Sequence, residues 1–366
     1  MNSGPVRRAS GKMASIEGAR GIAAILVVLM HCTHLMRVEQ FSGHVGLGGI
    51  FDFGYVGVDF FFVLSGFIIT FVHHPDLGRW QSLPVYLWRR LTRIYPIYWI
   101  SLGIYIAVAL LGRLALGKPP ALDMGWSDFP ATVLLAMTGE PKYVGVAWSL
   151  QYEIVFYLAF CPLILSARLG FTLFAVWALA ILLALAGGFD PGRAGFLFNG
   201  HCLEFLMGVG IGLAARRLRH RPAWAGMLPL ALGAFVLAVV YEMLLSPARH
   251  GADGRILLGA ASAAILWCLI RLETGGGIRT PAWLGALGSV SYSIYLTHVV
   301  FINATFSVLN LAHLYHALPD WAVFLIGLAG GLAGAGIVGY FLELPLVRRL
   351  KHLVKSPRPG HAAGRG

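Results

Sequence analysis

The chain has 366 residues, of which 58% are hydrophobic and only 12% are charged, and its formal net charge is +12. Its mean hydropathy is +0.74. A soluble globular domain carries about 25% charged residues, so the composition excludes a soluble enzyme and predicts an integral membrane protein. No motif of an RNA- or DNA-binding domain accompanies the basic residues, so their excess does not indicate a nucleic-acid partner.

Ten apolar segments are long enough to cross a bilayer as helices. In chain order they are 20–38, 54–73, 93–111, 145–165, 171–187, 196–214, 226–245, 255–271, 284–309 and 321–343. The apolar stretch 129–138 is too short to cross, and we expect it to lie at the interface or to re-enter the membrane. The predicted fold class is all-α, a polytopic helical bundle over 15–350 with basic tails at 1–14 and 351–366.

The placement of the basic residues predicts the orientation of the bundle. Ten spans put both termini on the same side of the membrane. With that side in the cytoplasm, about three quarters of the 28 Lys and Arg residues lie in cytoplasmic segments, as the positive-inside rule requires. We therefore expect both termini to be cytoplasmic and the net positive charge to reflect topology.

Ionisable side chains inside the predicted spans mark candidate functional positions, because each of them is costly in a membrane. His34, Glu242 and Glu343 lie near the ends of spans, where we expect them to reach the interface in structural roles. For His298 two alternatives remain open, a functional imidazole or an interhelical hydrogen bond. The full set is Arg20, His31, His34, Asp59, Glu153, His201, Glu204, Glu242, His298 and Glu343.

The segment RGIAAILVVLMH places a guanidinium and an imidazole on nearly one helix face. Arg20 and His31 are eleven residues apart, which is almost three turns and about 16 Å along the axis. In the predicted orientation Arg20 lies at the inner mouth with Arg90 and Arg93, and guanidinium forks match the oxygens of a polyphosphate ligand. His31 lies in the outer half, where an imidazole near a carboxylate is a common general base.

Six motifs follow one another between about residues 15 and 350. They are IEGARGIAAILVVLMH, GYVGVDFFFVLSGFIIT, RRLTRIYPIYW, AWSLQYEIVFYL, SYSIYLTH and FLELP. Together they resemble the membrane acyltransferase family 3, the acyl-CoA-dependent O-acyltransferases of bacterial glycans. The resemblance implies a multi-pass protein of the bacterial cytoplasmic (inner) membrane that moves an acyl group, commonly acetyl, from acyl-CoA to a hydroxyl of a surface polysaccharide or lipid-linked sugar. Larger relatives carry an extra outer domain, and we expect the stand-alone form here.

The resemblance also implies roles for particular residues. Arg20 and His31 take the positions of the family's Arg-x10-His signature, in which the histidine is catalytic. Arg90 and Arg93 take those of its Arg-x-x-Arg pair, and we expect all three arginines to bind acyl-CoA.

The WSL..E element of the family falls on Trp148, Ser149 and Glu153, with Gln and Tyr between Leu and Glu in place of the more usual small or polar residues. We expect Trp148 and Ser149 to bind the acceptor substrate together with His298.

We predict that acyl-CoA lies along the first helix, with its phosphates at the arginines and its thioester near His31. The imidazole of His31 would deprotonate the acceptor hydroxyl as this hydroxyl attacks the thioester. Either Glu153 or Asp59 would orient the imidazole. A covalent acyl-histidine intermediate is an alternative, and no metal is expected to take part.

A proton-coupled transporter of a small solute is the alternative function, because intramembrane histidines and carboxylates also form proton relays. The sequence has no detectable inverted repeat, and its predicted arginines gather at one mouth. Both features favour the enzyme.

Overall fold

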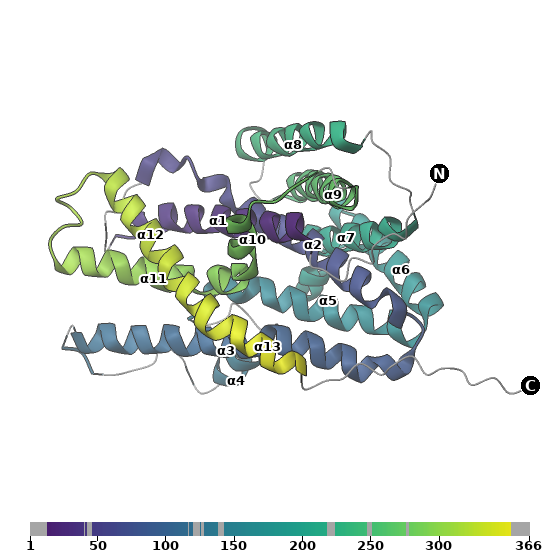
Figure 1. The fold of residues 1–366 in the computed structure, drawn as a ribbon, viewed down its shortest axis with the longest axis horizontal. Coiled ribbons are helices and arrows are strands. Elements are labelled where there is room, and N and C mark those ends of the chain that lie inside the picture. Colours follow the sequence, from purple (N-terminus) through teal and green to yellow (C-terminus); the bar gives the residue numbers. More distant parts are fainter. Residues whose placement is uncertain are drawn as a thin grey trace, which may run out of the picture.

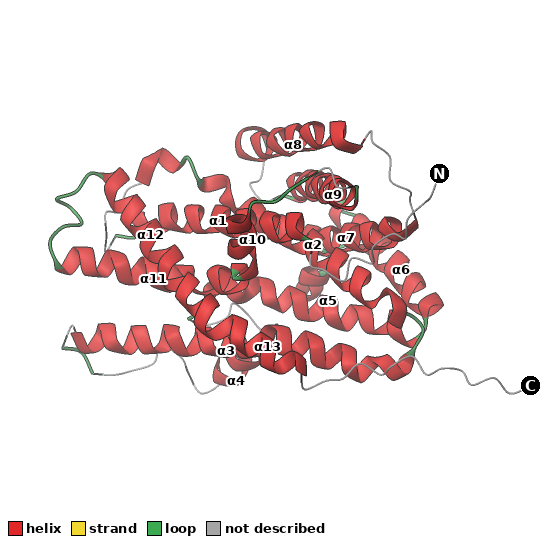
Figure 2. Ribbon diagram, viewed as in Figure 1, coloured by secondary structure: helices red, strands yellow, loops and turns green. Residues whose placement is uncertain are grey.

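The computed structural model describes residues 13–39, 41, 46–115, 117–119, 125, 128–137, 143–217, 224–246, 251–275 and 278–352. These residues form helices and connecting turns without a β-strand, as Figure 2 shows. Ten helical segments among them are long and apolar enough to cross a membrane. The predicted all-α membrane fold is therefore confirmed. The predicted tails, 1–14 and 351–366, lie almost wholly outside the described residues.

The described chain contains thirteen α-helices. They are α1 (Ala14–Met36), α2 (Val56–His73), α3 (Leu83–Ala115), α4 (Asp128–Leu134), α5 (Trp148–Leu165), α6 (Ala167–Leu185), α7 (Gly200–Arg217), α8 (Trp224–Val240), α9 (Ala252–Thr274), α10 (Ala282–Ser289), α11 (Ser291–Leu311), α12 (Asp320–Val338) and α13 (Leu344–His352). In Figure 1, α1 runs from the middle of the picture toward the left, and α13 runs toward the right and ends below the middle. The ends where α1 begins and α13 stops therefore face the right of the picture. We call this side basal and the opposite side, where α1 ends, distal.

The predicted span 284–309 is not one helix. It is divided at Val290, which leaves the helical conformation with φ −110° and ψ 8°, and in Figure 1 α10 runs across the axis of α1. Gly288 lies so close to the carbonyl of Glu17 in α1 that a Cβ atom would clash with it. The hydropathy of residues 284–309 shows no interruption, because the break at Val290 depends on the contact with α1.

The short helix α4 lies against α3 and does not cross, as predicted for 129–138. The last carbonyls of a helix lack partners within the helix itself, and here three side chains of α3 donate hydrogen bonds to them. The bonds run from Tyr95 to Leu134, from Tyr98 to Thr132 and from Trp99 to Val133, at 2.9, 2.6 and 3.0 Å.

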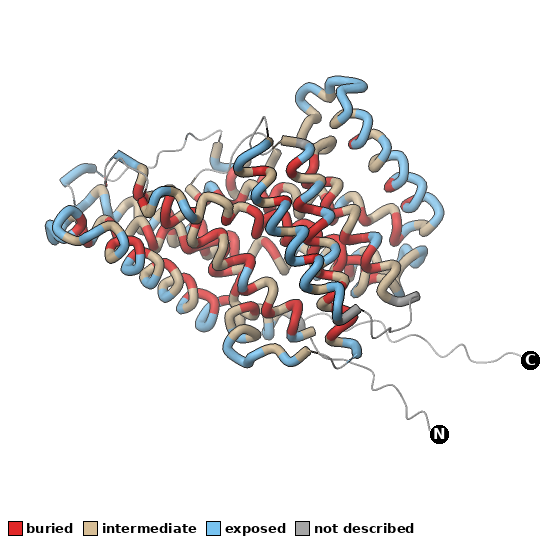
Figure 3. Tube along the Cα trace, turned by 90° about the horizontal axis from the view of Figure 1, so that it is seen from above, coloured by how far each residue is buried: buried red, intermediate tan, exposed pale blue. Residues whose placement is uncertain are grey.

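Glycines allow α2 and α7 to cross with their backbones in contact. A Cβ at Gly66 would clash with the carbonyl oxygen of Phe205, and a Cβ at Gly208 would clash with that of Val63. Close approach of this kind is typical of membrane helices, which have little hydrophobic driving force between them. Buried residues accordingly gather along the middle of the bundle in Figure 3. The outer surface is apolar, with Leu230 of α8 73% exposed.

The helix α1 is held by a carboxylate from the far end of α9. Glu273 accepts hydrogen bonds from the backbone N–H groups of Ala14 and Ser15, at 2.6 and 3.0 Å, and from the hydroxyl of Ser15. These N–H groups belong to the first turn of α1, which has no partner for them within the helix. Arg20 therefore lies one to two turns from an anchored helix end, and His31 lies on the distal part of the same helix.

Candidate active site

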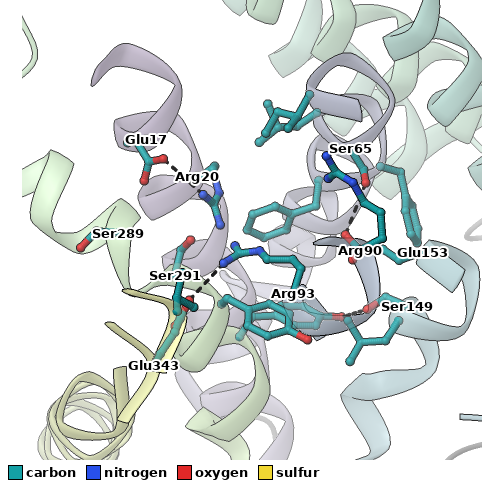
Figure 4. Close-up of a pocket in the computed structure, with 18 of the residues that line it drawn as sticks. Glu17, Arg20, Ser65, Arg90, Arg93, Ser149, Glu153, Ser289, Ser291 and Glu343 are labelled. Carbon is teal, nitrogen blue, oxygen red and sulfur yellow. Dashed lines mark hydrogen bonds and ion pairs between the residues drawn. The ribbon is translucent and has the colours of Figure 1, made fainter. Parts of the chain in front are cut away.

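A cavity of about 490 Å³ lies among α1, α2, α3, α5 and α11. Figure 4 shows the side chains of Arg20 from α1 and of Arg90 and Arg93 from α3 in its lining. Ser149 and Tyr295 line it farther toward the distal side. The structure thus brings together the three guanidinium groups that the sequence placed at one mouth.

The three arginines keep many hydrogen-bond donors available. Arg20 Nη1 lies 3.4 Å from Glu17 Oε1, and Arg93 Nη1 lies 3.4 Å from Glu343 Oε1. Arg90 faces two tyrosine rings at 5.6 and 6.0 Å, and its Nε has no hydrogen-bond partner among the described residues. Each guanidinium has five N–H donors, so these few long contacts leave a strongly donating wall suited to an anionic ligand.

Glu343 belongs to this wall, so the prediction that it reaches the membrane interface is wrong. Its side chain is 2% exposed, and Oε2 accepts hydrogen bonds from the N–H and the hydroxyl of Ser293, at 3.0 and 2.8 Å. Glu343 ends a π-helical turn, Gly339–Glu343, shortly before Pro345. A π turn accommodates one extra residue and so changes the direction of the side chains that follow, which turns this carboxylate inward.

Glu242 is also buried, at 1% exposure, and the same prediction is wrong for it. It lies in a second π-helical turn, Tyr241–Leu245, and its carboxylate packs against Gly254 in the first turn of α9. His34 is partly exposed, with Nε2 3.6 Å from Asp52 Oδ1.

Neither carboxylate predicted to orient His31 does so through any contact between described residues. Glu153 lies in the cavity, where it accepts hydrogen bonds from Ser65 Oγ at 3.4 Å and from the Tyr157 hydroxyl at 3.0 Å. Asp59 lies elsewhere, with Oδ1 3.2 Å from Arg255 Nη1. The direction of each carboxylate depends on how its helix is rotated about its axis, and packing against the neighbouring helices sets this rotation.

The imidazole of His31 is oriented by its own helix. Its Nδ1 donates to the carbonyl of Val27 at 2.9 Å, so in the neutral ring Nε2 carries the lone pair. The ring of His298, from α11, lies 4.9 Å away between centroids. His298 is fully buried and donates through Nδ1 to the carbonyl of Ile294 at 2.8 Å. This bond stays within α11, so His298 does not use Nδ1 for an interhelical hydrogen bond.

Tyr295 connects the cavity with the two imidazoles. It lines the cavity, exchanges a hydrogen bond with Ser149 Oγ at 2.8 Å and lies one helical turn before His298. The ring centroids of Tyr295 and His298 are 6.4 Å apart. The cavity lining includes Arg20 but not His31. His31 lies beyond the lining residue Tyr295, with the ring of His298 in contact with both.

Trp148 lies beside a second polar cluster instead of in the cavity lining. This cluster lies near the distal side, where Arg255 Nη1 is 3.2 Å from both Asp59 Oδ1 and His201 Nδ1. Glu204 Oε2 lies 3.3 Å from the same nitrogen of His201. Asp59, His201 and Glu204 could together hold a metal ion by their donor atoms, but the guanidinium already supplies the positive charge. Trp148 packs on the ring of His201 at 5.3 Å.

Sequence reasoning missed Arg255, Tyr295 and Glu17 as site residues. Arg255 lies at the distal end of its predicted span, at the same depth in the membrane as Asp59. This shared depth is the feature of the sequence that could have indicated their pairing. The tyrosines of SYSIYLTH carry no charge, so a search for ionisable groups in the membrane passes over them.

A membrane-spanning bundle with an arginine-lined internal cavity and two adjoining imidazoles has the parts of a transferase that takes an anionic donor. Sequence comparison gives the family. The family profile described as an acyltransferase domain matches residues 13–340, and the chain belongs to acyltransferase family 3.

The relatives that the chain resembles are bacterial. The exopolysaccharide production protein ExoZ of Rhizobium meliloti (strain 1021) is 29% identical over 328 residues, which are 86% of this chain and 95% of ExoZ. The acyltransferase MdmB of Streptomyces mycarofaciens is 25% identical, with 95% of this chain and 96% of MdmB covered. The peptidoglycan O-acetyltransferase OatA of Listeria monocytogenes is 23% identical over 79% of this chain and 39% of OatA. No solved structure matches the chain.

Proposed function

We propose that this protein is a membrane O-acyltransferase that moves an acyl group, acetyl in the simplest case, from acyl-CoA to a hydroxyl of an exopolysaccharide or lipid-linked sugar. Membership of acyltransferase family 3 supports the reaction class. The match to ExoZ over nearly its whole length supports a polysaccharide acceptor. The name of OatA supports acetyl as the acyl group.

One observation carries the proposal: three arginines line one part of the cavity, and the His31–His298 pair lies just beyond its distal end. Along α1 the distance from Arg20 to His31 is about 16 Å. Coenzyme A has its phosphates at one end and its thioester at the end of a long pantetheine arm. The phosphates would bind the arginines, and the arm would run along α1 toward the histidines.

His31 would act as the general base of the transfer. Its Nε2 lone pair takes the proton of the acceptor hydroxyl while the oxygen attacks the thioester carbonyl carbon. The carbon–sulfur bond then breaks, and the proton passes from His31 to the thiolate. The reaction is balanced without a metal or any further reactant.

We further propose that the basal side faces the cytoplasm of the bacterial inner membrane. The excess of basic residues on this side supports the orientation, and the arginine-lined part of the cavity would then open toward the compartment that holds acyl-CoA. His31 would lie in the outer half of the membrane, closer to a surface glycan.

The test separates donor binding from chemistry in protein purified in detergent. Arg90→Ala and Arg93→Ala should each weaken acetyl-CoA binding by about 1–3 kcal/mol, the value of a charge-assisted contact. Arg89→Ala is the matched control, because Arg89 is exposed on the same helix and does not line the cavity. His31→Ala should keep acetyl-CoA affinity and lose acyl transfer. Equal weakening by Arg89→Ala, or full transfer by folded His31→Ala protein, would contradict the proposal.

A further inference from the structure

The two imidazoles beyond the cavity are oriented by the same kind of hydrogen bond. His31 on α1 and His298 on α11 each donate from Nδ1 to the carbonyl four residues earlier in their own helix, at 2.9 and 2.8 Å. The rings are 4.9 Å apart between centroids and inclined at 66°. Because a neutral imidazole has one donor and one acceptor nitrogen, both rings carry their lone pair on Nε2.

Nε2 of His298 is a buried acceptor without a donor. The side chain is completely buried, and this nitrogen has no hydrogen-bond partner among the described residues. A buried acceptor left in this state destabilises the folded protein, and such atoms are rare enough in folded proteins to need a reason. A phenylalanine or leucine would occupy the same space without this cost.

The donor that completes His298 must come from a neighbouring side chain, because no solvent reaches the ring. His31 is in ring contact with His298, and under the proposed function it gains a new N–H group during the reaction. No described carboxylate is bonded to His31. Glu153 is bonded to Ser65 and Tyr157, and Asp59 is paired with Arg255.

We propose that Nε2 of His298 accepts a hydrogen bond from the Nε2–H group of the His31 imidazolium. This bond keeps the proton on His31 between the attack on the thioester and the departure of the thiolate. The inference rests on the proposed function. The acceptor O–H bond breaks as the oxygen bonds to the thioester carbon, and the proton moves to Nε2 of His31. The oxygen then becomes an ester oxygen, which is a weak acceptor, and Nε2 of His298 takes over the hydrogen bond. The carbon–sulfur bond breaks, and the thiolate takes the proton, so both imidazoles end neutral.

His298 is thus a positioning residue that acts through His31. In a hydrolase triad a carboxylate accepts the Nδ1 hydrogen of the histidine, whereas here the carbonyl of Val27 accepts that hydrogen and His298 accepts the one on Nε2. Nδ1–H of the imidazolium is already bonded to Val27. With His298, both N–H groups of the charged ring have acceptors, which stabilise a partly buried cation.

Two amide variants separate this role from packing. In His298→Asn the side-chain amide can replace Nδ1 but leaves no acceptor at the position of Nε2. In His298→Gln the longer side chain places an amide oxygen near that position, where it can accept a hydrogen bond. The probes are acetyl-CoA as donor and octyl glucoside as a membrane-soluble sugar acceptor, with the full chain in lipid nanodiscs.

We expect kcat to fall about 100-fold in His298→Asn and about tenfold in His298→Gln, the range found for hydrogen-bond partners of metal-bound imidazoles. The dissociation constant of acetyl-CoA should stay within twofold in both. His34→Gln is the matched control, since His34 also contacts the His31 ring, at 6.3 Å between centroids, but pairs with Asp52. Its kcat should stay within twofold.

Equal losses of kcat in the two amide variants would overturn the proposal and leave His298 a packing residue. A loss of acetyl-CoA affinity that accounts for the loss of kcat would overturn it as well. If His298→Asn does not give a monodisperse protein, His298→Leu, which also lacks an acceptor at the position of Nε2, takes its place in the comparison. Equal losses of kcat in His298→Leu and His298→Gln would then contradict the proposal. Failure of the proposed function would show differently, as an absence of coenzyme A release by the unmodified protein.

Discussion

Adding one methyl group at Gly208 should separate two helices that now touch. A Cβ at Gly208 of α7 would lie 1.9 Å from the carbonyl oxygen of Val63 and 2.8 Å from the backbone nitrogen of Phe67, both in α2. A carbon–oxygen contact needs about 3.3 Å, so the backbones must move apart by more than 1 Å. This movement also strains the stack of Phe205 on Phe156, whose ring centroids are 4.1 Å apart. Overpacking of this kind destabilises by about 1–3 kcal/mol.

The matched control lies two residues further along α7. A Cβ at Gly210 would meet nothing within 4 Å, so Gly210→Ala only removes the entropic penalty of glycine in a helix, a gain of about 0.5–1 kcal/mol. Thermal unfolding in detergent, followed by tryptophan fluorescence, should therefore give Gly208→Ala a lower Tm than the unmodified protein and Gly210→Ala an equal or higher one. Acetyl-CoA affinity should fall with Gly208→Ala, because α2 lines the cavity. Two variants with the same Tm would refute the argument from the helix crossing.

Three further changes test separate parts of the structure. Glu273→Ala removes the hydrogen bonds to the first turn of α1 and should lower the free energy of unfolding by about 0.5–2 kcal/mol, as loss of a helix cap does; an unchanged Tm would show that water replaces them. Arg255→Leu should cost about 3 kcal/mol, the low end for a buried ion pair because Arg255 is 20% exposed, and Asp59→Leu in the same chain should restore most of it. Independent losses would contradict the pairing. For the orientation, a cysteine replacing Asp190 should react with an impermeant thiol reagent in intact cells and one replacing Arg219 should not, while labelling at 219 alone would reverse the proposed topology.

The sequence was sufficient to predict most of the spans and the meeting of the arginines. Hydropathy measures the length of an apolar segment, and the predicted spans 145–165 and 226–245 coincide with observed ones. Arg20 and Arg93 meet because both lie near the basal ends of their helices and must face inward to avoid lipid. These conclusions need only depth in the membrane, which the linear sequence encodes.

The partners of the intramembrane groups could not be predicted, because they depend on helix rotation and on local departures from the α-helix. Depth alone allowed Asp59 to face His31, but the close crossing at Gly66 and Gly208 orients α2 so that Asp59 meets Arg255 on α9. Glu343 lies near the end of its predicted span, which predicts a position at the interface, but the π turn directs its side chain into the cavity. The division at Val290 has the same origin, since it follows from the contact between α10 and α1.

The ion pair between Arg93 and Glu343 joins residues 250 positions apart, and this separation has a consequence for biosynthesis. A ribosome adds about 5–20 residues per second, so roughly 10–50 s pass after Arg93 is made before its carboxylate exists. During this time α3 carries an intramembrane cation whose partner has not yet been synthesised. The basal part of α3 must therefore stay near water. The cavity that Arg93 and Glu343 line is therefore among the last parts of the molecule to form. A chain released before α12 lacks Glu343 and therefore presents the guanidinium of Arg93 without this carboxylate.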